Sequence, residues 1–224
     1  MTEIISVHDK SALKKALAAL RKDGIIVYPT ETSYGLGCDA TNPATVKKLL
    51  KIKKEPRGRP CSVIISSIGM AKEYAKFGKT ALVLIKKFMP GPLTLVCEKT
   101  NKTPNVLSKK TIAFRISGNK FANSLAERFG KPITSTSANI HGYGSIYDIG
   151  KIKKVFLGKV DLIIDAGSLP RRRPSTIFDL EAKKILRKGP ISFCQIQSEL
   201  LADACPLAVA KRRICLRRVS ALEP

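Results

Sequence analysis

Four short segments of this 224-residue chain are rich in side chains that could hold an anionic or polar ligand. They are residues 28–37 (YPTETSYGLG), 51–60 (KIKKEPRGRP), 135–139 (STSAN) and 171–176 (RRRPST). Hydroxyl and backbone N–H groups at strand ends can hold small polar ligands, and Lys and Arg side chains suit polyphosphates. Because acidic residues are scarce in these segments, they indicate electrostatic handling of phosphate, not proton transfer.

Two of these segments also have purely structural interpretations, which the residues alone leave open. Residues 28–37 are consistent with a capped turn whose Thr and Glu side chains bind the local backbone. Residues 51–60 are consistent with a solvated helix end, where the helix dipole favours cations. Residues 135–139 carry three hydroxyls and one amide. That is more than a turn requires, so we favour a binding role for this segment.

Several common catalytic signatures are absent from the sequence. The motifs GxxxxGK[ST], GxGxxG and GxSxG do not occur. Six cysteines, at positions 38, 61, 97, 194, 205 and 215, form no CxxC pair, and His8 and His141 are the only histidines. A structural zinc site needs paired ligands at short spacing. We therefore expect no metal site, and we expect reduced thiols that pack as small apolar groups.

The chain is strongly basic. It has 41 Lys and Arg against 17 Asp and Glu, a formal net charge of +24, of which residues 190–224 contribute only +2. The charge therefore belongs to the body of the chain, and we expect an anionic partner such as phosphate, nucleotide or nucleic acid. No apolar run approaches the roughly 20 residues of a membrane span, and the N-terminus lacks a secretory pattern. We expect a cytoplasmic chain with no membrane partner.

Apolar periodicity and turn residues predict alternating helices and strands. An α/β domain with a mixed sheet is the architecture that this order favours. Asn42 and Pro43 open one helix as N-cap and first helical residue. The signals fade after Gly189-Pro190, so we place a domain boundary there, with residues 190–224 as a basic tail of unknown role. The predicted helices are 11–23, 42–54, 69–77, 80–88 and 119–129, and the predicted strands are 25–28, 62–65, 93–97, 111–116, 132–135, 162–165 and 176–180.

Seven motifs in order resemble the YrdC-like family, the threonylcarbamoyl-AMP synthases. The resemblance covers roughly residues 10–190, and it rests on the order of the motifs because each is weak alone. It implies a single twisted α/β domain, residues 1–189, with a mixed sheet around a basic cleft. The family condenses L-threonine, bicarbonate and ATP into threonylcarbamoyladenylate and pyrophosphate, for threonylcarbamoyladenosine formation in tRNA. The motifs are PTETSYGLG, the segment with Lys53 before RGRP, PGPLTLV, TIAFRIS, STSAN, PSTIFDL and ILRKGP.

The resemblance implies two groups of site residues. Those expected to hold threonine are Thr32, Arg115, Ser135 and Ser175, with Arg115 on the substrate carboxylate. Those expected to line ATP and its phosphates are Lys53, Arg57, Arg59, Thr111, Ser137, Asn139, Ser145 and Arg187. ATP is a substrate in this interpretation, Mg²⁺ is expected to arrive with the nucleotide, and no metal is expected to be bound by protein ligands.

One position departs from the family pattern. The family has Lys-x-Arg at the helix end, whereas this chain reads Lys53-Lys54-Glu55. Arg57, or Lys54, could supply the missing charge, and we expect Glu55 to point away from the cleft with Arg57 as the nearer cation. The alternative is weakened phosphate binding and a different or reduced activity.

A second function fits the same fold and charge. A basic concave surface could bind double-stranded RNA or tRNA through phosphate contacts, without catalysis, and a third alternative is an assembly partner that has lost catalysis. An enzyme needs threonine, bicarbonate and ATP together, whereas a simple RNA binder needs only a polyanion and loses affinity steeply with salt. If the chain is the enzyme, its product should pass to a complex that transfers the threonylcarbamoyl group to tRNA.

Overall fold

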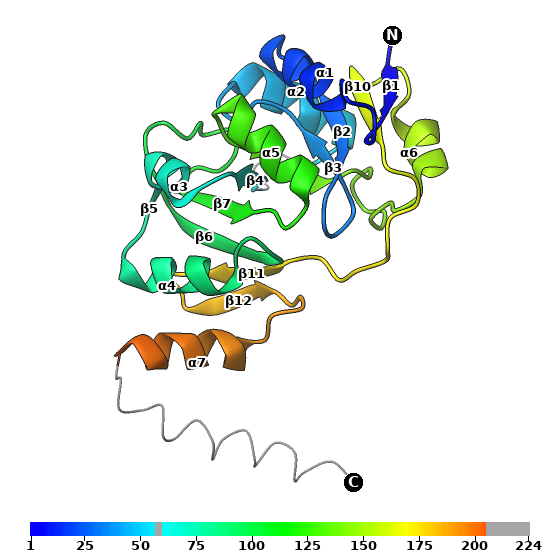
Figure 1. Ribbon diagram of the computed structural model, residues 1–224. Helices are drawn as coiled ribbons and strands as arrows, with labels where there is room; N and C mark the ends of the chain where they lie inside the picture. The colour runs from blue at the N-terminus through cyan, green and yellow to red at the C-terminus, as the bar shows by residue number, and fades with distance from the viewer. Residues whose placement is uncertain (57–59, 205–224) are drawn as a thin grey trace, which may run out of the picture.

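The computed structural model describes residues 1–56 and 60–204, which form two mixed sheets flanked by helices (Figure 1). The first sheet has five strands, in which β2 pairs in parallel with β10 and antiparallel with β3. Its spatial order is β1 (Glu3–Ser6), β10 (Leu162–Asp165), β2 (Ile26–Pro29), β3 (Tyr34–Gly37) and β9 (Thr136–Ser137).

The second sheet has seven strands, with β5 (Ala75–Lys76) paired to one strand off the main path. Its main order is β12 (Lys184–Arg187), β11 (Thr176–Asp179), β6 (Leu93–Lys99), β7 (Thr111–Ile116), β4 (Ser62–Ile65) and β8 (Ile133–Thr134). The sequence predicted one mixed sheet, and the structure has two. Residues 133–137 supply β8 to one sheet and β9 to the other, so this segment joins them.

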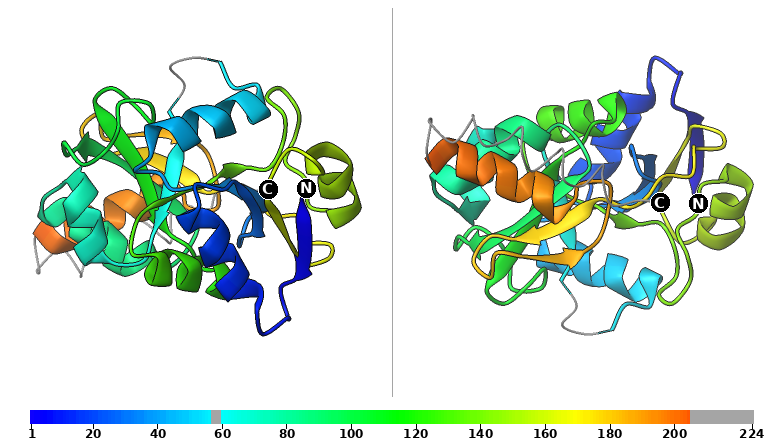
Figure 2. Two further views of the ribbon diagram at one scale, coloured as in Figure 1. Left: turned by 90° about the horizontal axis from the view of Figure 1, so that it is seen from above. Right: turned by 90° about the horizontal axis from the view of Figure 1, so that it is seen from below.

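The described residues form seven helices that cover the sheets. Figure 2 shows α1 beside α5, and α7 beside α4. The predicted cap is confirmed, because the side chain of Asn42 accepts hydrogen bonds from the backbone N–H groups of Ala44 and Thr45. The helices are α1 (Ala12–Arg21), α2 (Pro43–Lys53), α3 (Ile68–Tyr74), α4 (Lys79–Phe88), α5 (Lys120–Phe129), α6 (Ile149–Phe156) and α7 (Phe193–Ala204).

Two apolar clusters hold these layers together, and β2 contributes to both. Val27 belongs to the larger cluster, which contains residues of both sheets and of α4, α6 and α7. Ile26 and Tyr28 belong to the smaller one, with residues of α1 and α5. Because β2 is covered on both faces, its carboxyl end is fixed firmly in space. The turn that follows it can therefore hold side chains in definite positions.

Three of the cysteines pack in the core as small apolar groups, as the sequence analysis expected. Cys38, Cys61 and Cys97 are buried free thiols, and burial raises the pKa of each to about 12. Cys194 is exposed, while Cys205 and Cys215 lie outside the described residues. The buried thiols are therefore protonated at neutral pH.

The expectation that regular structure fades after residue 190 is wrong for residues 193–204, which form α7. Ile196 of this helix is fully buried, and Glu199 lies 3.4 Å from Lys87 Nζ of α4. The helix was missed because only one short apolar stripe, with Ile196 and Leu200, faces the core. The remainder of the predicted tail, residues 205–224, lies outside the described residues.

No helix in the described part of the chain is long and apolar enough to cross a membrane.

Candidate active site

The turn between β2 and β3 is organised by one hydroxyl. Thr30 Oγ1 accepts hydrogen bonds from the backbone N–H groups of Thr32 and Ser33, at 3.2 Å and 3.3 Å, and donates to the carbonyl of Ser33 at 2.7 Å. The hydroxyl of Thr32 lies 3.1 Å from the same atom. Thr32 and Glu31 are therefore held at the carboxyl end of a buried strand, where open α/β sheets bind their ligands.

Arg115 of β7 lies at the centre of the first polar cluster. Its Nη1 forms an ion pair with Glu31, and its Nη2 donates to Ser135 Oγ at 3.1 Å. Ser117 donates to the second carboxylate oxygen of Glu31. The side chains of Arg115 and Glu31 are only 6% and 11% exposed. The structure thus brings Arg115 and Ser135 together, as the threonine prediction requires.

Glu31 is the residue that sequence reasoning missed at this cluster. It lies 84 residues from Arg115 in the chain, so no local pattern links the two. The available signal was the position of a single carboxylate in a hydroxyl-rich turn directly after a buried strand. A buried cation is normally paired, so a buried arginine implies an acidic partner, and Glu31 is that partner.

Ser175 is in direct contact with Arg187 of β12. Arg187 donates from Nε to the carbonyl of Ser175 at 3.0 Å and from Nη2 to its hydroxyl at 2.9 Å. The hydroxyl of Thr94 lies 2.8 Å from that of Ser175. Partial burial lowers the pKa of Arg187, and the charge of Arg115 lowers it further. Ser175, which was predicted to bind threonine, and Arg187, which was predicted to bind ATP, are therefore in direct contact. The charge of Arg115 acts on Arg187.

The second polar cluster surrounds Lys53, the last residue of α2. Its Nζ donates to the carbonyl of Ser137 at 3.0 Å and to the side-chain oxygen of Asn139 at 2.7 Å. Ser137 Oγ donates to the same oxygen of Asn139 at 2.6 Å. The structure brings together these three predicted residues, which come from α2 and from the segment that joins the two sheets. Because Ser135 belongs to the first cluster, residues 135–139 contribute side chains to both clusters.

Glu55 points toward Lys53, so the expectation that it points away from the cleft is wrong. Its side chain is 10% exposed, with Oε2 3.7 Å from Lys53 Nζ and Oε1 3.2 Å from His141 Nδ1. Two causes are visible. Lys54 adopts the left-handed conformation at the helix end, with φ of 53°, and the Glu55 N–H then bonds the carbonyl of Leu50. The turned-back chain brings the carboxylate of Glu55 to the buried Lys53.

The predicted Arg57 and Arg59 lie outside the described residues.

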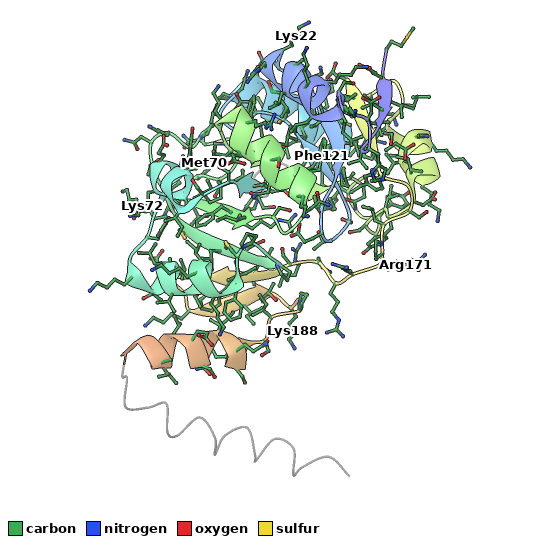
Figure 3. All side chains as sticks on the ribbon, viewed as in Figure 1. Lys22, Met70, Lys72, Phe121, Arg171 and Lys188 are labelled. Carbon is green, nitrogen blue, oxygen red and sulfur yellow. The ribbon has the colours of Figure 1, made fainter. Side chains whose placement is uncertain are left out.

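A pocket of about 900 Å³ opens beside the Lys53 cluster and shares Asn139 with it. Asn139 also donates from Nδ2 to the carbonyl of Tyr143, which fixes the loop that frames the pocket. The predicted Ser145 lines it. Arg171, labelled in Figure 3, reaches it from the segment between β10 and β11. The charged residues of the lining are mostly cations: Lys54, Lys151, Lys154 and Arg171, with Asp148 as the acid.

Thr111 is the predicted residue that lies apart from both clusters. It begins β7 on the same face as Arg115, four residues away, which is about 13 Å along a strand. Its hydroxyl lies 3.2 Å from that of Ser108. The structure therefore places Thr111 on the correct face of the strand without bringing it into contact with Arg115 or Lys53.

The fold and the two clusters define a class of proteins. The Sua5/YciO/YrdC family model, described as "Telomere recombination", matches residues 18–189. The chain belongs to this family. The chain is 33% identical over 184 residues to a threonylcarbamoyl-AMP synthase of Pseudoalteromonas translucida (strain TAC 125), a match that covers 80% of this chain and 98% of that protein.

Solved structures of the same family share the fold. The Sua5 protein of Pyrococcus abyssi, complexed with L-threonine, matches with a TM-score of 0.83 and 31% identity, covering 89% of this chain and 60% of that one. E. coli YciO matches with a TM-score of 0.79 and 27% identity, covering 88% and 100%. The predicted class, a single α/β domain with mixed pairing, is confirmed. The chain spans about three fifths of the Pyrococcus protein.

Proposed function

We propose that this chain condenses L-threonine, bicarbonate and ATP into threonylcarbamoyladenylate and pyrophosphate. The observation that carries this proposal is the pair of buried clusters at Arg115 and Lys53, joined by residues 133–139 in a chain of this family. The similarity to a threonylcarbamoyl-AMP synthase over most of both chains supports catalysis. It speaks against the alternative of an RNA-binding module without activity.

We assign the first cluster to threonine. Arg115 would bind the substrate carboxylate, because a buried guanidinium forms strong, oriented hydrogen bonds with a carboxylate. Ser135, which contacts Arg115, supplies one hydroxyl, and we assign the hydroxyls of Ser175 and Thr32 to the same ligand. The Pyrococcus relative whose structure contains L-threonine supports the substrate class.

We assign the second cluster and the adjacent pocket to ATP. Lys53 and Ser137 both contact Asn139, which lines the pocket, and the phosphates would lie at this point, closest to the threonine cluster. Arg187 would reach the phosphates from the side of Ser175. Mg²⁺ would come with the nucleotide, because this ion keeps water and phosphate oxygens as ligands and needs few from the protein. The cationic lining of the pocket supports the expectation of a basic cleft.

The chemistry requires only that the reactants be held in order. The ammonium group of threonine loses a proton to water, and the neutral amine attacks the carbon of bicarbonate. A C–N bond forms, and water leaves to give a carbamate. A carbamate oxygen then attacks the α-phosphorus of ATP, and pyrophosphate leaves with its bonding electrons. The reaction is a nucleotidyl transfer. Positioning and neutralisation of phosphate charge supply most of the acceleration in such reactions.

The product is a reactive mixed anhydride and needs an acceptor. We propose that the threonylcarbamoyl group passes to an adenosine in tRNA through a transfer complex, and that the strong positive charge of the chain supports contact with tRNA or double-stranded RNA. ATP and tRNA occur together in the cytoplasm, and we propose that the chain acts there.

The proposal is tested by the phosphate product. Purified protein with L-threonine, bicarbonate, Mg²⁺ and ATP should release pyrophosphate, and omission of threonine or of bicarbonate should stop the release. Release of orthophosphate with ADP, or no turnover with any amino acid, would overturn the proposal.

A further inference from the structure

The ion pair between Arg115 and Glu31 puts one cation and one anion side by side in the proposed threonine cluster. Both side chains are almost completely buried, and Ser117 holds the second oxygen of the carboxylate. A single buried cation would suffice for a substrate that carries only a carboxylate. A free amino acid carries two opposite charges on groups bonded to the same carbon, and Arg115 with Glu31 presents the reverse of that pattern.

We infer that Glu31 recognises the α-amino group of the substrate, while Arg115 binds its carboxylate. This inference rests on the proposed function and adds a role for a residue outside the predicted site. The ammonium group needs an acceptor of opposite charge once water is excluded, since an unpaired buried charge is strongly unfavourable. The carboxylate of Glu31 has lone pairs beyond those used by Arg115 and Ser117.

The neighbouring groups explain why Glu31 has this role. Thr32, Ser135 and Ser175 offer only neutral hydroxyls to the ligand. Arg187, which contacts Ser175, is itself a cation and cannot accept a hydrogen bond from an ammonium group. Glu31 is the carboxylate in direct contact with Arg115. It also follows that Glu31 discriminates against substrates that lack the amine.

Isothermal titration calorimetry with two ligands shows whether Glu31 recognises the amine of the substrate or only holds Arg115 in position. The ligands are L-threonine and (R)-3-hydroxybutyrate, which keeps the carboxylate and the hydroxyl but has no amine. The wild-type protein should bind threonine at least about tenfold more tightly than hydroxybutyrate, which corresponds to roughly 1.4 kcal/mol. Glu31→Gln should weaken threonine binding by a similar factor, and binding of hydroxybutyrate should be unchanged or tighter because a nearby negative charge is removed.

Two controls complete the experiment. Ser117→Ala removes a hydrogen bond to Glu31 but keeps the carboxylate, so it should preserve the ratio of the two affinities. If Glu31→Gln weakens both ligands equally, Glu31 merely supports Arg115 and the inference is wrong. If that variant does not fold, the ratio of the two affinities of the wild-type protein tests the inference. Equal wild-type affinities for threonine and hydroxybutyrate would overturn it. Absence of threonine binding to wild-type protein would instead overturn the proposed function.

Discussion

The buried guanidinium of Arg115 is the residue on which the threonine assignment depends most. Arg115→Ala should weaken L-threonine binding by on the order of 2–5 kcal/mol, because the charge pair it forms with the substrate is desolvated. Calorimetry with the purified variant measures this change. Arg128→Ala, on the exposed surface of α5, is the matched control and should leave the affinity unaltered. Unchanged threonine affinity in Arg115→Ala would remove Arg115 from the site.

Glu55 sets the charge of the proposed phosphate site, because its carboxylate lies 3.7 Å from Lys53 Nζ. A negative charge about 6 Å from a phosphate weakens phosphate binding by roughly 1–3 kcal/mol at an effective dielectric near 20. Glu55→Gln should therefore tighten ATP binding by about tenfold, measured as a dissociation constant. Glu98→Gln, an exposed acid paired with Lys76, is the control. Weaker ATP binding in Glu55→Gln would show instead that Glu55 positions Lys53.

At the scale of elements, the position of Ser175 depends on a close approach of the backbone at Gly189. A Cβ atom at this position would lie 2.3 Å from the backbone N of Thr176 and 2.5 Å from the carbonyl oxygen of Pro174. Gly189→Ala should therefore displace Ser175, weaken threonine binding and destabilise the fold by about 1–3 kcal/mol. Gly78→Ala meets nothing within 4 Å and is the control. Equal melting temperatures for the two variants would contradict this account.

Helix α7 is an integral part of the described fold, and its packing can be tested directly. Ile196 is fully buried, whereas Leu201 on the same helix is 63% exposed. Ile196→Ala should lower the free energy of unfolding by about 2–5 kcal/mol. Leu201→Ala should change it by less than about 0.5 kcal/mol. Denaturant titration measures both, and similar values would mean that α7 does not pack as described.

Buried strands were predictable from the sequence, and exposed strands were not. The strands 62–65, 111–116 and 162–165 were predicted at their observed bounds, because each is mostly apolar and has buried residues on both faces. Strands β1 and β12 are mostly exposed, and each has only two apolar residues, so their apolar signal is weak. Strand β3 was hidden in a glycine-containing segment, where Gly37 approaches the ring of Tyr28 so closely that a Cβ would lie 2.5 Å from it.

The candidate site was predictable as a set of residues but not as an arrangement. Lys53, Ser137 and Asn139 were predicted from the family resemblance, and the structure brings them into contact. The contact between Lys53 and Ser137 joins residues 84 positions apart, which no local pattern encodes. The inward turn of Glu55 depends on the left-handed backbone of Lys54, a conformation that a lysine rarely adopts.

At the scale of the whole molecule, the two sheets meet at residues 133–137, and the two polar clusters meet there as well. The covalent continuity of this segment fixes the distance between the proposed threonine and phosphate sites. A condensation between an amino acid and a nucleotide needs such a fixed relation, because correct positioning contributes much of the rate. The net charge of +24 adds attraction for anionic ligands in general.

The central claim is that both clusters serve one condensation, and the identity of the adenylate tests it most directly. The protein is incubated with L-threonine, Mg²⁺, ATP and bicarbonate labelled with heavy carbon, and the adenylate is analysed by mass spectrometry. We predict an adenylate that contains both threonine and the labelled carbon, formed by wild-type protein and lost in both Lys53→Ala and Arg115→Ala. An adenylate without the label, or full activity in either variant, would contradict the account.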